Sequence, residues 1–494
     1  MSLLGGLLVW VALGTCAAVV QPPLLPDRSA IVQLFEWTFK EIEEECKNFL
    51  GPYGFAGVQT SPINEYIVIN PSRPWYERYQ PISYKIISRS GNEDEFKKMV
   101  ETCNKVGVRI FVDVVFNHMS GDAPNARGTG GSPADPKNKY YPAVPYNKSH
   151  FHSTCSIESY QNAHEVRNCE LVGLRDLDQS QFYVREKIIE YLNHLIDLGV
   201  GGFRVDAVKH MWPADVQYIY SKVKSLSTVH GFKAGTKPYI YQEVIDLGGE
   251  GIKATEYTDF GSVVDFVYSR EVGKAFGGRN QLKWLRSYGT SWGILPSEKS
   301  LAFIDNHDNQ RDGGEDILSY KRPREYKMAN AFMLSWPHGT KRIMSSYDFT
   351  ERDQGPPHNK DNSIAPVIRK PDMSCGGGWI CEHRWRQIYN MVGFNNAVKG
   401  TVVKNFWDNG NNQIAYCRGN KGFIAFNGEN SNMDVLLQTC LPAGTYCDVI
   451  SGSRQGNGRC SGKSIIVDSS GMGKINIPRD GEDGVLAIHL NVRV

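Results

Sequence analysis

Between residue 31 and about residue 347 of this 494-residue chain, short apolar segments alternate with amphipathic ones, and this limits the fold more than any other feature. Helical periodicity between short, nearly continuous apolar runs is typical of parallel βαβ units. Helical patterns cover residues 39–50, 93–106, 181–198 and 214–226. The apolar runs cover residues 31–37, 54–63, 109–118, 199–208, 238–245, 263–269, 300–308 and 341–347. Eight such strands favour a closed (β/α)8 barrel, an α/β fold, over an open sheet.

Two intervals depart from this alternation. Residues 119–180 are rich in Gly, Pro, Asn and Asp, and they predict a subdomain inserted after the third strand rather than a long structureless loop. Beyond about residue 400, short strands with turn signals predict a separate C-terminal antiparallel β domain. The expected division is a signal peptide at 1–18, a catalytic barrel from 19–118 and 181–398, an insert at 119–180, and an all-β domain at 399–494.

The first 18 residues predict secretion. An apolar run from Leu3 to Leu13 precedes the small residues Cys16, Ala17 and Ala18, although no Lys or Arg comes before it. The alternative is a buried N-terminal helix; the run is too short to span a bilayer. Cleavage after Ala18 leaves ten of the 11 cysteines, without the spacing of a zinc site, so disulfides in an extracellular compartment are expected. Asn147-Lys148-Ser149 is a glycosylation sequon.

Charge and aromatic content narrow the class of ligand. The formal net charge is +2 and the basic residues are scattered, which argues against nucleic acid as a partner. The chain has 55 Trp, Tyr and Phe residues, and sugar rings stack on such side chains. A soluble carbohydrate fits this composition better than a nucleic acid or a membrane.

Ionisable residues gather where four of the predicted strands end. They lie in residues 113–118, 204–210, 243–246 and 305–308. A single acid at such a place is more often a helix cap or a salt-bridge partner. Four clusters at the carboxyl ends of barrel strands, where barrel enzymes carry their active sites, are hard to explain by structure alone.

The acids in these clusters suit glycoside hydrolysis. A retaining glycosidase needs an ionised carboxylate as nucleophile and a protonated carboxyl group as acid. Arg204 lies two residues before Asp206, on the same face of a strand, and an adjacent guanidinium favours the ionised carboxylate. Asp206 is therefore the predicted nucleophile and Glu243 the predicted acid/base.

The four clusters closely resemble the four sequence regions of the α-amylase family of glycoside hydrolases, and the animal type in particular. The resemblance runs from about residue 31 to the C-terminus and includes residues 70–84 and 444–452. It implies Asp206 as nucleophile, Glu243 as general acid/base and Asp308 as the acid that stabilises the transition state. It also implies that substrate is contacted by Trp75, Tyr76, Tyr79, His118, Lys209, His210 and His307.

The activity implied by the resemblance is endo-hydrolysis of internal α-1,4-glucosidic bonds in starch and glycogen, with retention of configuration. The products would be maltose and malto-oligosaccharides, and the enzyme would be a secreted monomer. A second reading is an α-glucosidase on the same barrel, but its usual Gln-Pro-Asp-Leu-Asn stretch is replaced by residues 173–177, Gly-Leu-Arg-Asp-Leu. A third is a non-catalytic relative, which would have lost at least one of the three acids.

The resemblance also implies a calcium ion. Its ligands would be the side chains of Asn117 and Asp176 and the backbone carbonyls of Arg167 and His210. All four supply oxygen, which a hard cation requires. Taken alone, Asn117 and Asp176 would more often be turn residues.

A chloride ion is implied by Arg204, Asn306 and Arg342. The alternative for Arg342 is a salt bridge within the barrel. A chloride ion near Glu243 would raise the pKa of that carboxyl group, because a negative charge disfavours ionisation.

Disulfides 46–103, 155–169, 375–381 and 447–460 follow from the same resemblance, which leaves Cys417 and Cys440 to pair with each other. Ile87 replaces a cysteine of the vertebrate relatives. Residues 312–316 are shorter than the glycine-rich loop of those relatives and contain no histidine, as is common in invertebrate amylases. The cleft is therefore expected to be more open on that side.

Overall fold

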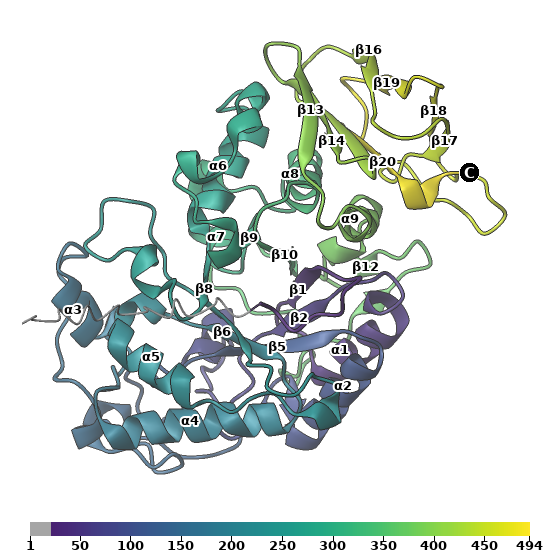
Figure 1. The fold of residues 1–494 in the computed structure, drawn as a ribbon. Helices are drawn as coiled ribbons and strands as arrows, with labels where there is room; N and C mark the ends of the chain where they lie inside the picture. Colours follow the sequence, from purple (N-terminus) through teal and green to yellow (C-terminus); the bar gives the residue numbers. More distant parts are fainter. Residues whose placement is uncertain (1–20) are drawn as a thin grey trace, which may run out of the picture.

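The computed structural model describes residues 21–494, so the predicted signal peptide, residues 1–18, lies outside the described residues. Eight parallel strands close into a barrel in the order β1-β10-β9-β8-β7-β6-β5-β2 (Figure 1). Seven strands are buried at every residue, which explains their continuous apolar runs. The strands are β1 (Ala30–Leu34), β2 (Gly57–Thr60), β5 (Arg109–Val114), β6 (Gly202–Val205), β7 (Tyr239–Gln242), β8 (Ser262–Val264), β9 (Ser300–Phe303) and β10 (Thr340–Ser345). The predicted (β/α)8 barrel is confirmed.

Helices surround the barrel, and their sequences explain their ends. In α2, the Asn92 side chain accepts from the Glu95 N–H while the Glu95 side chain accepts from the Asn92 N–H. The same helix buries Phe96, Met99 and Val100 at helical spacing. The helices are α1 (Phe39–Glu45), α2 (Glu93–Lys105), α3 (Ala163–Asn168), α4 (Phe182–Asp197), α5 (Pro213–Lys222), α6 (Phe266–Phe276), α7 (Asn309–Asp312), α8 (Pro323–Ser335) and α9 (Arg386–Ala397).

The predicted strand over residues 263–269 is wrong in its second half. Strand β8 ends at Val264, and α6 begins at Phe266. The Asp265 side chain accepts from the Tyr268 N–H and caps the helix. The apolar run continues across this boundary because both elements bury apolar residues, so periodicity alone could not separate them.

The segment between β5 and α4 contains α3 and several isolated β-bridges, with Cys155 bonded to Cys169. It returns to the barrel through a bridge between His118 and Asp176 and a bond from the Leu177 N–H to the Asn117 carbonyl, 3.0 Å long. The end of β5 and the end of this segment are therefore held together.

The chain ends in two four-stranded antiparallel sheets, β13-β14-β15-β20 and β16-β19-β18-β17 (Figure 1). Tyr416 and Phe426 belong to the same buried cluster as the barrel residues. Arg418 donates to the Ser335 carbonyl at the end of α8 and, at 2.8 Å, to the Thr401 carbonyl after α9. The strands are β13 (Val403–Asp408), β14 (Gln413–Arg418), β15 (Gly422–Asn427), β16 (Met433–Gln438), β17 (Gly444–Cys447), β18 (Ser464–Val467), β19 (Met472–Ile477) and β20 (Val485–His489).

Five disulfides link the ten cysteines among the described residues, with the predicted pairing of 46–103, 155–169, 375–381, 417–440 and 447–460. Within residues 21–494, none of the helices has the length and apolar character that crossing a membrane requires.

Candidate active site

A cleft of about 440 Å³ opens at the carboxyl ends of the barrel strands. Asp206 follows β6 and Glu243 follows β7, so both acids stand where the barrel strands end. The structure brings the three predicted acids together with most of the predicted substrate-binding residues. The predicted residues that line the cleft are Trp75, Tyr76, Tyr79, His118, Asp206, Glu243, His307 and Asp308.

Arg204 joins two of the acids. Its Nη1 atom lies 2.5 Å from Asp206 Oδ1, and its Nη2 atom lies 2.7 Å from Glu243 Oε1. The two terminal nitrogens belong to one planar guanidinium group, so the two carboxyl groups lie side by side. The predicted contact between Arg204 and Asp206 is present, and the contact with Glu243 adds to it.

Burial and neighbouring charges give the acids different pKa values. Burial raises the pKa of Glu243 to about 7, against the opposing effect of Arg204. Burial also raises the pKa of Asp206, and the bond from Arg204 opposes this rise. Glu243 is thus suited to carry a proton near neutral pH, while Asp206 is the acid whose carboxylate form the guanidinium favours most directly.

The pKa of Asp308 is lowered, whereas those of Glu243 and Asp206 are raised. Although burial acts to raise it, the pKa of Asp308 is held at about 2, chiefly by His307 and then by Arg204 and Arg311. His307 Nε2 lies 3.1 Å from Asp308 Oδ2. The His307 ring stacks on Tyr79 with ring centroids 4.9 Å apart. Asp308 therefore remains ionised in the cleft.

Asp113 is a functional neighbour to which the sequence assigned no role. It is fully buried, accepts from Arg204 Nη1 at 2.8 Å and from the Tyr79 hydroxyl at 2.9 Å. It therefore fixes both the arginine between the acids and the aromatic ring beneath the cleft. The sequence feature that could have identified Asp113 is its place in the ionisable cluster at residues 113–118.

Aromatic and apolar side chains form the walls of the cleft. The Trp75 indole N–H donates to the Arg352 carbonyl at 3.0 Å, and its ring packs edge-on against Tyr76. Val172 is 89% exposed and has a φ of 45°, which is rare for a β-branched residue. The sequence did not single out the apolar part of the lining, which includes Leu171, Val172, Leu174, Ile245 and Leu247.

Lys209 and His210 lie just beyond this lining. Lys209 Nζ donates to Glu250 Oε2 at 2.8 Å and lies over the Tyr160 ring. The His210 ring Nδ1 bonds to the Val166 carbonyl at 2.9 Å. His118, which does line the cleft, bonds through Nε2 to the Tyr79 carbonyl at 2.9 Å.

Two of the predicted calcium ligands, Asn117 and Asp176, lie where β5 and the inserted segment are joined, and each leaves a side-chain oxygen free within residues 21–494. Asn117 Oδ1 and Asp176 Oδ1 are both buried and have no hydrogen-bond partner among the described residues. Asp176 Oδ2 accepts from His152 at 2.7 Å. The His210 ring bonds to the carbonyl of Val166, the residue before Arg167, so these two predicted ligands belong to segments that are in contact. These oxygen donors fit a hard cation, which would supply the missing partners.

Of the predicted chloride ligands, Arg342 offers donors from which an anion could accept. Arg204 already contacts Asp113, Asp206 and Glu243, and Asn306 Oδ1 accepts from the N–H groups of Asp308 and Asn309. Arg342 is 1% exposed, and its Nε and Nη2 atoms have no partner within residues 21–494. Its Nη1 atom donates to Gln59 at 3.0 Å. Burial lowers the pKa of Arg342 to about 10, and the nearby Arg204 adds to this, whereas Tyr241, Asp113 and Glu243 oppose the shift. No carboxylate of the described chain pairs with Arg342, which contradicts the alternative of a salt bridge.

The short loop at residues 312–316 is tied to the rim of the cleft. Arg352 donates to both carboxylate oxygens of Asp312, with distances of 2.7 to 3.0 Å. Asp312 and Gly313 line the cleft. The loop therefore belongs to the site, although the sequence assigned no role to it.

Comparison with known proteins agrees with this geometry. The family described as "Alpha amylase, catalytic domain" matches residues 73–345, and "Alpha amylase, C-terminal all-beta domain" matches residues 404–491. The chain is 55% identical to an alpha-amylase-related protein of Drosophila pseudoobscura pseudoobscura, over 98% of both chains. It is 56% identical to that of Drosophila sechellia, over 95% of this chain and 94% of the relative.

A solved structure shows the same relationship. Alpha-amylase I of the earthworm Eisenia fetida, solved as a mutant in complex with maltohexaose, is 43% identical. It aligns over 96% of this chain and 99% of its own, with a TM-score of 0.90. The chain therefore belongs to the animal α-amylases of glycoside hydrolase family 13.

Proposed function

We propose that this protein is an α-amylase (EC 3.2.1.1) that hydrolyses internal α-1,4-glucosidic bonds of starch and glycogen with retention of configuration. The observation that carries the proposal is the contact of one guanidinium, that of Arg204, with both Asp206 and Glu243 at the base of an aromatic cleft. Retaining hydrolysis needs two carboxyl groups beside one bond, in different protonation states.

The three acids have different roles in the proposed reaction. Glu243 gives its proton to the glycosidic oxygen as the bond to the anomeric carbon breaks, and Asp206 Oδ forms a bond to that carbon from the other side. Ionised Glu243 then takes a proton from water, whose oxygen displaces Asp206 and restores both groups. The ionised Asp308 stabilises the positive charge that develops on the sugar ring.

Malto-oligosaccharide is the proposed ligand of the cleft. The earthworm relative binds maltohexaose, and the aromatic walls here offer apolar faces for glucose rings. Tyr79 and His307 form a stacked pair below the acids, and Trp75 and Tyr76 extend the aromatic surface. We propose His118, Lys209 and His210 as further contacts on either side of the cleaved bond.

Calcium and chloride are proposed as the resident ions. Asn117 and Asp176, with the carbonyls of Arg167 and His210, would hold calcium and join residues 119–180 to the barrel. Arg204, Asn306 and Arg342 would hold chloride. Bound chloride would supply a negative charge near Glu243, which favours the protonated acid. The five disulfides support the further proposal that the protein is secreted. The proposed enzyme acts as a monomer.

The product profile on soluble starch tests this function. An endo-acting α-amylase releases mixed malto-oligosaccharides from the first minutes, an α-glucosidase releases glucose alone, and a non-catalytic relative releases nothing. The measurement is chromatography of products over time, with Glu243→Gln as the blank. Glucose as the sole early product, or no product, would contradict the proposal.

A further inference from the structure

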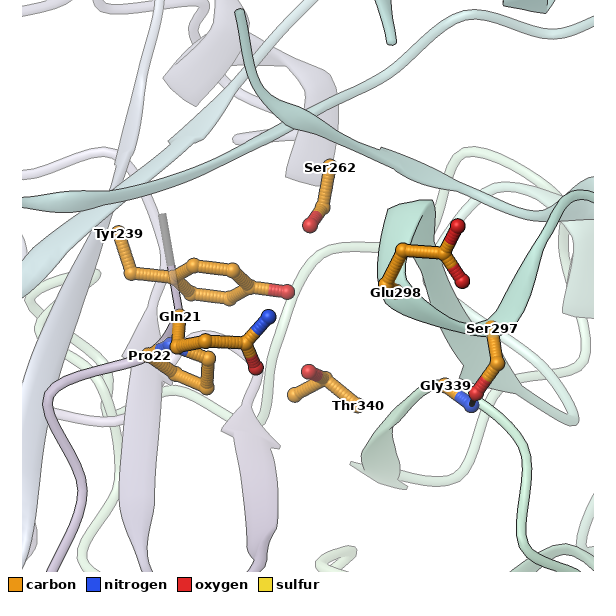
Figure 2. A pocket seen from close by; sticks show the side chains of 8 residues that line it. All are labelled: Gln21, Pro22, Tyr239, Ser262, Ser297, Glu298, Gly339 and Thr340. Atoms are coloured by element: carbon orange, nitrogen blue, oxygen red, sulfur yellow. Dashed lines mark hydrogen bonds between the residues drawn. The ribbon is translucent and has the colours of Figure 1, made fainter. Parts of the chain in front are cut away.

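Two neighbouring cavities lie at the end of the barrel opposite the acids. The first, of about 290 Å³, is lined by the Tyr239 side chain, at the start of β7 (Figure 2). Glu243 follows the other end of that strand. In Figure 2 the side chains of Tyr239, Ser262 and Thr340 point toward the middle of this cavity. These cavities are therefore distinct from the catalytic cleft.

The second cavity, of about 380 Å³, is lined by four cationic side chains and is called the basic cavity below. It shares Gln21, Pro22, Gly339 and Thr340 with the first. Its cations come from the start of the described chain, from β10, from the segment after α9 and from β14. They are Arg28, Lys341, Lys399 and Arg418, and no Asp or Glu lines the cavity.

The cations of the basic cavity donate hydrogen bonds to backbone carbonyls, which carry no net charge. Lys341 donates to the carbonyls of His338 and Gly339, at 2.6 and 2.9 Å, which leaves one N–H of its ammonium group. Lys399 donates to the carbonyls of Pro26 and Arg28. Within residues 21–494, none of the four forms a salt bridge.

Two of these cations are deeply buried. Lys341 is 6% exposed and Arg418 is 3% exposed. The Nε atoms of Arg28 and Arg418 are buried and have no hydrogen-bond partner among the described residues. A buried charge is costly unless it is paired, and a buried donor without an acceptor adds to that cost. Four cations thus line one cavity that has no carboxylate in its lining, and two of them keep a buried donor without an acceptor among the described residues.

Burial, and for Lys341 a neighbouring cation as well, acts against the charges of the two buried residues. Burial, and then the charge of Arg418, lower the pKa of Lys341 to about 7. Burial lowers the pKa of Arg418 to about 10. Both shifts show that positive charge is disfavoured in the basic cavity as it stands, and a bound anion would reverse them.

We propose that the basic cavity binds a small oxyanion, of the sulfate or phosphate class. Arginine forks and a lysine ammonium group are the usual ligands of such anions. Ser29 and Thr340 line the same cavity and offer neutral hydroxyl donors. The anion would connect the start of the chain, the barrel and the C-terminal domain. The site does not depend on the proposed starch hydrolysis.

Titration calorimetry with inorganic sulfate tests the proposal, because sulfate leaves calcium in solution at millimolar concentrations. The full protein is held in saturating chloride and at constant ionic strength, so that the catalytic chloride site and general salt effects do not contribute. We expect saturable binding and a rise in melting temperature of about 2 °C. The absence of saturable heat would overturn the proposal.

Variants locate the site. Lys341→Met should weaken sulfate binding about tenfold or more, and Lys399→Gln about threefold, because each removes a charged donor. Lys237→Gln is the matched control, since Lys237 is also an exposed lysine that donates to a backbone carbonyl but does not line the cavity. Equal binding by Lys399→Gln and Lys237→Gln would overturn the proposal even if Lys341→Met did not fold. Starch hydrolysis by Lys399→Gln should match wild type.

Discussion

Arg204 Nη2 lies 2.7 Å from Glu243 Oε1, and both side chains are almost completely buried. A cation in contact with a general acid favours loss of the proton that the acid must donate. Arg342 is a second buried cation whose positive charge acts on Glu243. The protonation of Glu243 therefore depends on what neutralises these two arginines.

Chloride should activate this enzyme through Glu243. Bound chloride adds negative charge near the carboxyl group, raises its pKa and keeps it protonated to higher pH. The alkaline limb of the kcat/KM profile, which should fall as the pH rises through about 7, should therefore move upward when chloride is added. The measurement is a pH–rate profile in chloride-free buffer and in added chloride.

Arg342→Gln should abolish that response to chloride, because a neutral amide attracts an anion far less than a guanidinium group does. The variant should retain measurable activity, since the three acids remain. Arg352→Gln, at an arginine outside the barrel, should keep the wild-type shift. Superimposable wild-type profiles with and without chloride would contradict the chloride site.

Asp206→Asn and Glu243→Gln should each lower kcat on starch by several orders of magnitude, because the two groups act as a unit. Circular dichroism should remain that of the native fold. Glu298→Gln, at the opposite end of the barrel, is the control and should be fully active. Retention of more than about a tenth of wild-type turnover by either variant would remove its assigned role.

Calcium chelation should lower the melting temperature and expose residues 119–180 to proteases, since the ion binds the native state. Asp176→Asn should melt lower than wild type and respond less to chelator. Asp122→Asn, in the same segment but 57% exposed, should respond as wild type does. Identical wild-type melting curves with and without chelator would rule out the calcium site.

Glu45 should be a major determinant of acid stability. It is buried between His383 and Arg384, at 3.0 and 2.6 Å, and although burial opposes the shift, these partners lower its pKa from 4.5 to about 2. Since the folded pKa is below the unfolded one, the stabilisation is present above about pH 4.5 and is lost as the pH falls toward 2.

Glu45→Gln should therefore destabilise the protein by about 3–5 kcal/mol at neutral pH and flatten the loss of stability in acid. Urea unfolding at pH 7 and at pH 4 measures both effects. Glu44→Gln is the matched neighbour, because Glu44 is 47% exposed, and its variant should change stability by less than about 1 kcal/mol. Equal effects of the two substitutions would contradict the role of Glu45.

The barrel was predictable because its strands are buried on both faces, so each appears in the sequence as a nearly continuous apolar run. An apolar run gave the wrong strand end after Val264, because a buried helix follows the buried strand and only the helix cap at Asp265 separates them. Cluster positions predicted that Asp206, Glu243 and Asp308 meet, because parallel strands present their carboxyl ends together.

Side-chain partners across the barrel were not predictable from local sequence. That Asp113 bonds both Arg204 and Tyr79 depends on the register between β5 and β6 and on the 3-10 helix Trp75–Tyr79, which lies between β2 and β5 in the chain. The free nitrogens of Arg342 could not be foreseen either, because their lack of an acceptor is a property of the packed interior. The basic cavity brings together residues from the start of the described chain and from the C-terminal domain, which no local motif records.

The C-terminal β domain shares a core with the barrel, and this affects how the protein is made. Tyr416 and Phe426 belong to the buried cluster that also contains residues of the first barrel strand. Arg418 donates hydrogen bonds to the carbonyls of Ser335, at the end of α8, and Thr401, after α9. During synthesis from the N-terminus, the barrel emerges before the β domain that supplies these groups. Until β14 and β15 have emerged, the carbonyls of Ser335 and Thr401 lack the Arg418 donor and the shared core is incomplete, so we expect the barrel to reach its final packing only after these strands are made.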